Sequence, residues 1–191
     1  PIFTAEVAST FNELLLLDHL LKTTGDRARR LYLLDHHLTQ MTGTVVRQTM
    51  FAEFELNIHE LGEQRETLTS DSLGELYHGI VGEFWGPEAV LDPERSPRTW
   101  SRIPHFYYDF YVYQYATAYS AAAAFSRAVL AGGEVERERY LDILRSGCSR
   151  YPVETLAAGG VDMMNRAPFG DVLRLYGERI DEIEALLGKE G

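Results

Sequence analysis

The sequence predicts an all-α fold, and three observations support this fold class. Apolar residues recur at the roughly 3.6-residue period of an α-helix through most of the chain. Glycine and proline separate these stretches, and no clear run of alternating strand character appears. Hydrophobic residues make up 45% and charged residues 25% of the 191 residues, as in ordinary soluble chains. We therefore expect residues 1–191 to form one helical unit with its own core.

The first predicted helix covers residues 3–24. Val7, Phe11 and Leu14 recur at helical spacing and would form its buried face. Gly25 follows this stretch and supplies a stop, because glycine readily adopts the left-handed conformation that ends many helices.

A very long helix is predicted over residues 27–64, followed by a shorter one. Gly43 weakens the long helix by about 1 kcal/mol relative to alanine, so the sequence allows a kink there. Ser70 and Asp71 are good N-caps for the third helix, which ends near Trp85. The prolines and glycine that follow predict an irregular loop, and such long loops often border a site.

Four more helices are predicted in the second half of the chain. The fourth, over residues 106–131, is rich in tyrosine and then in alanine, whose small side chains permit close helix packing. A short amphipathic helix over residues 134–145 follows. Pro152 suits the first turn of a helix that runs to residue 158, and Pro168 begins the last helix, which ends near residue 187.

Composition narrows the partners and the compartment. The formal net charge of −11 would repel nucleic acid and anionic lipid, so we expect neither as a partner. No apolar run reaches the roughly 18 residues that a membrane-spanning helix needs. The single cysteine, Cys148, excludes an internal disulfide, and we expect it to be a buried small residue. A reducing compartment fits these features, and we interpret the protein as cytoplasmic.

Two glutamates in the first predicted helix are candidates for metal chemistry. Glu6 and Glu13 are separated by seven positions, which brings both carboxylates to nearly the same helix face. Spacing alone favours two solvated surface charges, because most surface helices carry such pairs. Residues 6–13, however, resemble the zinc-site helix of the thimet oligopeptidase and oligoendopeptidase F family of zinc metallopeptidases. The resemblance implies that Glu6 is the third zinc ligand and that Glu13 orients a zinc-bound histidine.

Residues 103–117 resemble the substrate segment of oligoendopeptidase F more specifically. In that family a histidine and tyrosines from this region bind the peptide backbone and donate hydrogen bonds to the oxyanion that forms during hydrolysis. The resemblance assigns this contact to His105 and Tyr115, with Tyr108 and Tyr111 next in line. A tyrosine hydroxyl suits the role because it is a neutral donor at neutral pH.

Helical spacing is a second guide among these tyrosines. In a helix over residues 106–131, Tyr108, Tyr111, Tyr115 and Tyr119 would share one face. Aromatic packing alone would account for about half of such tyrosines in an α-domain. The register against distant relatives also leaves Tyr111 as an alternative for the role given to Tyr115.

Two histidine clusters do not form zinc motifs. His59 and the next residue begin like HExxH, but Glu63 stands where the second histidine belongs, so we interpret this segment as an exposed helix end. His36 and His37 diverge by about 100° around a helix and cannot easily chelate one ion. HExxH is therefore absent from the 191 residues, and the resemblance implies that the chain begins just downstream of it.

Residues 47–55 and 158–163 agree with the same family, so the resemblance covers nearly the whole chain. It implies the helical C-terminal portion of a larger zincin-like oligopeptidase, with oligopeptides as substrates and zinc in the complete enzyme. We expect the chain alone to be inactive, to bind zinc too weakly to matter, and to associate with the missing N-terminal part or with itself. The alternative is a non-catalytic helical module for peptide binding or assembly.

Overall fold

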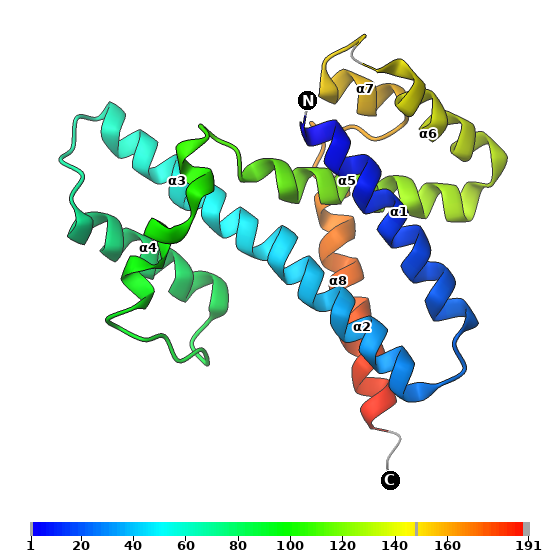
Figure 1. The fold of residues 1–191 in the computed structure, drawn as a ribbon, viewed down its shortest axis with the longest axis horizontal. Helices are drawn as coiled ribbons and strands as arrows, with labels where there is room; N and C mark the ends of the chain where they lie inside the picture. The colour runs from blue at the N-terminus through cyan, green and yellow to red at the C-terminus, as the bar shows by residue number, and fades with distance from the viewer. Residues whose placement is uncertain (1, 148, 189–191) are drawn as a thin grey trace. The chain divides into compact units, whose positions relative to one another are not determined.

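The computed structural model describes residues 2–147 and 149–188 (Figure 1). Its regular elements in these ranges are all helical, which confirms the predicted all-α class. None of the described helices is both long enough and apolar enough to cross a membrane. Cys148 lies outside the described residues, and so does its predicted burial. The α-helices are α1 (Ile2–Thr23), α2 (Arg27–Met41), α3 (Arg47–Glu63), α4 (Ser70–Trp85), α5 (Tyr113–Gly132), α6 (Glu134–Ser146), α7 (Pro152–Ala158) and α8 (Ala167–Leu187).

The chain groups into two compact units. Unit 1 combines Pro1–Thr44 with Gln114–Gly191, and unit 2 is Val45–Tyr113. The prediction that residues 1–191 form one helical unit stays a prediction.

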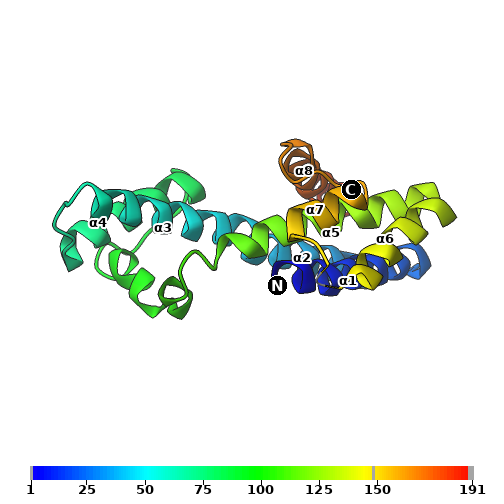
Figure 2. The same ribbon diagram turned by 90° about the horizontal axis from the view of Figure 1, so that it is seen from above.

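Unit 1 is a packing of helices around α5. Helix α2 contacts both α1 and α8, and α6 contacts α7. Figure 2 shows α5 running between α8 on one side and α1 and α2 on the other. Its alanines, including Ala121 and Ala122 at 0% exposure, are buried among the surrounding residues of the unit. The alanine-rich part of α5 is therefore core, as predicted.

Unit 2 is built on α3 and α4, which contact each other, and on the 3₁₀ helix η2 (Ser96–Arg102), which contacts α4. Thr69, rather than Ser70, caps α4: its hydroxyl accepts the Ser72 N–H, and the Ser72 side chain bonds back to the Thr69 N–H. The apolar core of the unit consists of Met50, Phe51, Phe54, Tyr77, Ile80, Val81 and Val112.

The long helix predicted over residues 27–64 is divided into α2 and α3. A π-helical segment, η1 (Thr42–Val46), joins the two and contains Gly43. A π-helical turn holds one more residue than an α-helical turn, so it changes the side-chain register along the helix. The sequence allowed a kink at Gly43, and the structure has a change of helix type there.

The helix predicted over residues 106–131 was wrong in its first turns. The 3₁₀ helix η3 (Pro104–Tyr107) precedes it, and α5 begins only at Tyr113. Between them, Asp109 and Phe110 take φ angles of 48° and 53°, a left-handed conformation that a right-handed helix cannot contain. Tyr108 and Tyr111 therefore lie outside α5, and the predicted helical face shared with Tyr115 and Tyr119 does not exist.

Candidate functional site

Three of the predicted site residues form one ring cluster in unit 2. The ring centroid of His105 lies 5.5 Å from that of Tyr111 and 6.3 Å from that of Tyr108. The two tyrosine rings are 5.9 Å apart. Although Tyr108 and Tyr111 lie outside α5, the irregular segment before this helix brings both of them beside His105.

The ring cluster stands on the core of unit 2. Pro104 opens η3, and Phe106 in the same turn packs its ring 5.4 Å from Phe54 and 5.7 Å from Phe51. With Phe106 anchored, His105 beside it is half-buried, while Tyr108 is 61% exposed. The cluster is therefore anchored on the core through Phe106, and its polar groups remain accessible to solvent.

These side chains suit the stabilisation of a developing negative charge. A phenol donates one hydrogen bond, and an imidazole donates from one ring nitrogen when neutral and from both when protonated. Donors that are already oriented need little rearrangement when charge develops on a substrate oxygen. The ring contacts of His105 with Tyr108 and Tyr111 place these donors next to one another.

A buried carboxylate in α3 contacts the same segment. Glu55 is 1% exposed, and its Oε1 accepts a hydrogen bond from the Phe110 N–H at 2.9 Å. The His59 ring lies 4.4 Å from the Phe110 ring. Burial raises the pKa of Glu55, while the Phe110 N–H and His59 act to lower it and Asp109 acts to raise it. This support was missed in the sequence, although Glu55 follows Phe51 by one helical turn on the buried face.

The remaining predicted residues belong to unit 1. Glu6 is half-buried and Glu13 is exposed, both on α1, whose buried face includes Val7 as predicted. Tyr115 is half-buried on α5. The roles assigned to these three residues stay predictions.

A buried histidine–tyrosine pair lies in the same unit. His37 is 2% exposed, and its Nε2 is 2.8 Å from the hydroxyl of Tyr119, which is also buried. Burial and the negative charge of Glu13 raise the pKa of Tyr119. Burial first, and then the charges of Arg179 and His36, lower the pKa of His37 to about 4. Both groups are therefore neutral near pH 7 and hold α2 and α5 together.

The described residues do not form a complete zinc site by themselves. Within residues 2–147 and 149–188, no group of three or more histidine, cysteine, aspartate or glutamate side chains is placed to hold a metal ion. Glu6 fits one position of a His₂Glu set, and the two histidines would have to come from elsewhere. His59 and Glu63 are exposed, as predicted for a helix end, and His36 is exposed while His37 is buried.

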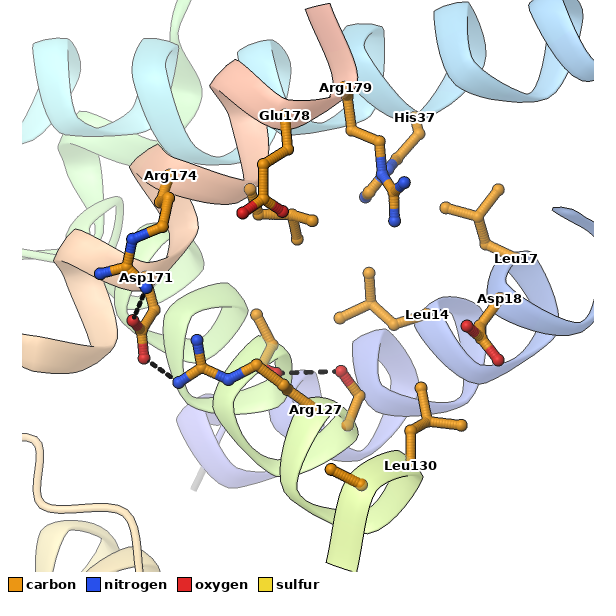
Figure 3. Close-up of a pocket in the computed structure, with 14 residues that line it drawn as sticks. Leu14, Leu17, Asp18, His37, Arg127, Leu130, Asp171, Arg174, Glu178 and Arg179 are labelled. Atoms are coloured by element: carbon orange, nitrogen blue, oxygen red, sulfur yellow. Dashed lines mark hydrogen bonds and ion pairs between the residues drawn. The ribbon is translucent and has the colours of Figure 1, made fainter. Parts of the chain in front are cut away.

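Unit 1 also contains a cavity of about 370 Å³ lined by α1, α2, α5 and α8 (Figure 3). Leu14 contributes to its apolar wall. Asp171 forms ion pairs there with Arg127 and, at 2.9 Å, with Arg174. The hydrogen bond from Arg127 holds the pKa of Asp171 below its usual range. Of the described residues that line this cavity, none belongs to the predicted site.

Comparison with known proteins identifies the family. Residues 1–175 match the family model of peptidase family M3, which is more than half of the chain. The chain belongs to peptidase family M3. The M3 chain is 47% identical over 188 residues to oligopeptidase PepF of Bacillus subtilis and 43% identical over 189 residues to the chromosomal oligoendopeptidase F of Lactococcus lactis subsp. cremoris.

These relatives are much longer than the M3 chain. The alignment covers 98% of the chain but 28% of PepF, and 99% of the chain but 31% of the Lactococcus protein. The crystal structure of oligoendopeptidase-F from Enterococcus faecium matches with a TM-score of 0.95 at 43% identity, over 100% of the chain and 36% of that protein. The M3 chain therefore spans about a third or less of each.

The lowered pKa of His37 predicts that the M3 chain loses stability in acid. The folded pKa lies near 4 and the ordinary value is 6.5, so between these values the unfolded chain binds a proton that the folded chain does not. Stability from this residue is complete above pH 6.5 and is lost as the pH falls toward 4, by up to about 3 kcal/mol. Urea unfolding over this range measures the loss.

A matched pair of variants isolates this effect. His37→Gln should flatten the decline in unfolding free energy between pH 6.5 and pH 4, because glutamine does not titrate. His19→Gln changes an exposed histidine on α1 that is not among the groups that shift the pKa of His37, and it should leave the slope close to that of the unaltered chain. Equal slopes for His37→Gln and the unaltered chain would contradict the prediction.

Proposed function

We propose that the chain is the C-terminal, substrate-recognising part of a zinc metalloendopeptidase that hydrolyses oligopeptides. The observation that carries this proposal is the clustering of His105, Tyr108 and Tyr111 in a chain of peptidase family M3. Two relatives at 43–47% identity bear the names oligopeptidase and oligoendopeptidase, which supports oligopeptides as the substrate class.

In this proposal Glu6 supplies one zinc ligand and Glu13 orients a histidine ligand. Zinc, when bound, supplies the Lewis acidity that activates water for attack on a peptide carbonyl. Glu6 is half-buried and Glu13 is exposed, seven residues apart on one helix, so segments outside the described residues can reach both carboxylates. The histidine ligands and the general base would come from an HExxH segment that these 191 residues lack.

The donors to the reacting carbonyl are His105 and Tyr115, with Tyr108 and Tyr111 as further contacts to the peptide. His105 carries donors at a half-buried, fixed position, and the two tyrosines beside it extend the donor surface. Tyr115 is half-buried at the start of α5, one helical turn before Tyr119, whose hydroxyl is hydrogen-bonded to His37. Tyr111 is the alternative for the role of Tyr115.

Partners and compartment follow from the same proposal. Association with the rest of the enzyme or with a second copy is part of the proposal, and it is supported by the chain's coverage of only 28% and 31% of two relatives. The single cysteine supports a reducing compartment, and we propose the cytoplasm. The absence of HExxH from the chain supports an inactive isolated chain, or alternatively a non-catalytic peptide-binding module.

A chimera tests the metal role. The chain replaces the 188 matched residues of PepF, and zinc content and cleavage of a fluorogenic peptide are measured. The unaltered chimera should bind zinc stoichiometrically and cleave the peptide, whereas Glu6→Ala should lose both because one ligand of the set is gone. Glu13→Gln should weaken zinc affinity by about 10- to 100-fold.

The control for this test is Asp18→Asn on the same helix, where Asp18 pairs with Lys22 at 2.8 Å. It should leave zinc content and cleavage unchanged. A Glu6→Ala chimera that retains zinc and cleavage would contradict the role of Glu6 as a zinc ligand. An unaltered chimera that folds but cleaves nothing would favour the non-catalytic module.

The same chimera tests the tyrosines. Tyr115→Phe removes only a hydroxyl, so it should lower kcat by roughly 10²- to 10³-fold while KM changes little, as expected for a donor used mainly in the transition state. Tyr107→Phe is the matched control, because Tyr107 is 82% exposed and was not assigned to the site. If Tyr111→Phe lowers kcat and Tyr115→Phe does not, the role belongs to Tyr111.

A further inference from the structure

Glu55 is a charged side chain in the core of unit 2 that the proposed chemistry does not use. It lies on α3 at 1% exposure, next to Phe54 at 0%. Burying a carboxylate is costly unless hydrogen bonds compensate it, and an apolar residue would fill the same space at less cost. Its Oε1 accepts the Phe110 N–H at 2.9 Å, across 55 positions of sequence. The carboxylate therefore accepts a hydrogen bond from one backbone N–H of the segment between η3 and α5.

That backbone group belongs to a strained turn. Asp109 and Phe110 both adopt left-handed φ angles, 48° and 53°. Two consecutive non-glycine residues in this region persist only when the surroundings hold them there. Glu55 holds the Phe110 N–H, and the His59 ring lies 4.4 Å from the Phe110 ring. Just after the turn, Val112 is 0% exposed in the core of unit 2.

The strained turn separates two residues of the ring cluster. Tyr108 precedes it and Tyr111 follows it, yet their rings are only 5.9 Å apart. A regular helix over these residues would instead set the directions of the two side chains by its rotation of about 100° per residue. The direction in which the chain leaves the turn therefore decides whether both rings lie beside His105.

We propose that Glu55 is a positioning residue whose buried carboxylate fixes the left-handed turn at Asp109 and Phe110 and so sets Tyr108 and Tyr111 beside His105 to receive the peptide. The claim about peptide rests on the proposed function of the ring cluster. The claim about the turn does not, and it can be tested on the chain alone.

Nuclear magnetic resonance of the 191-residue chain tests the turn. In Glu55→Leu, exchange of the Phe110 amide should become at least about tenfold faster, while the Phe54 amide in the core of α3 stays protected. Glu55→Gln keeps an acceptor oxygen and should retain most of the Phe110 protection. Glu53→Leu makes the same change two positions away on α3 and should leave Phe110 unaffected. Unchanged Phe110 exchange in a folded Glu55→Leu would overturn the proposal.

The pH dependence of the chemical shift of the Phe110 amide separates the hydrogen bond from a purely packing role of Glu55. Glu55 faces His59 and Asp109, and its pKa lies above that of an ordinary glutamate. The Phe110 shift should therefore titrate at this raised pKa in the unaltered chain and lose that step in Glu55→Gln. Asp109→Asn removes the carboxylate next to Phe110 while keeping a residue that tolerates the left-handed conformation, and it should preserve the step. A step at the same pH that persists when Glu55→Gln is combined with Asp109→Asn would overturn the proposal even if Glu55→Leu did not fold.

Kinetics in the PepF chimera test the consequence for substrate. Glu55→Gln should keep kcat/KM within about threefold, and Glu55→Leu should lower it by at least about tenfold because the rings are misplaced. Zinc content should not change in either variant. Loss of Phe110 protection with unchanged kcat/KM would overturn the positioning role. If the unaltered chimera cleaves nothing, the proposed function fails and the claim about peptide falls with it, whereas the amide measurements still decide the claim about the turn.

Discussion

The hydrogen bond from the Phe110 N–H to the buried Glu55 carboxylate is the contact on which the candidate site depends. It holds a left-handed turn where the local sequence favours a helix, so α5 begins at Tyr113 instead of near residue 106. The chain before α5 is thereby free to follow the core of unit 2 through Phe106 and to gather three polar rings at one place. The buried Glu55 carboxylate thus accepts a hydrogen bond from a backbone group in a left-handed turn.

Much of the helical fold follows from local signals. The ends of α4 at Trp85 and α7 at Ala158, and the start of α7 at Pro152, lie where capping residues, glycine and proline predict them. The start of α5 was missed because the deciding contact, Glu55 to Phe110, spans 55 positions. The tyrosines there repeat at helical spacing, so the prediction followed this local pattern. The hydrogen bond joins residues too far apart in the sequence for a local pattern to reveal it.

The site was predictable only in part for a related reason. Resemblance to a peptidase family singled out His105, Tyr108 and Tyr111, and these three do come together. It gave no role to Glu55, although a glutamate one helical turn after the buried Phe51 is a signal that could have been followed. The buried pair of His37 and Tyr119 was missed because its partners lie 82 positions apart.

We propose that this chain supplies both a metal ligand and the hydrogen-bond donors of a peptidase active site. A crystal structure of the PepF chimera with zinc and a tetrahedral peptide analogue tests it most directly. We predict a Glu6 carboxylate oxygen at about 2.0–2.2 Å from zinc. We also predict His105 and Tyr115 or Tyr111 within roughly 2.7–3.1 Å of the analogue's tetrahedral oxygen. Zinc bound without Glu6, or an analogue that none of these rings contacts, would contradict the account.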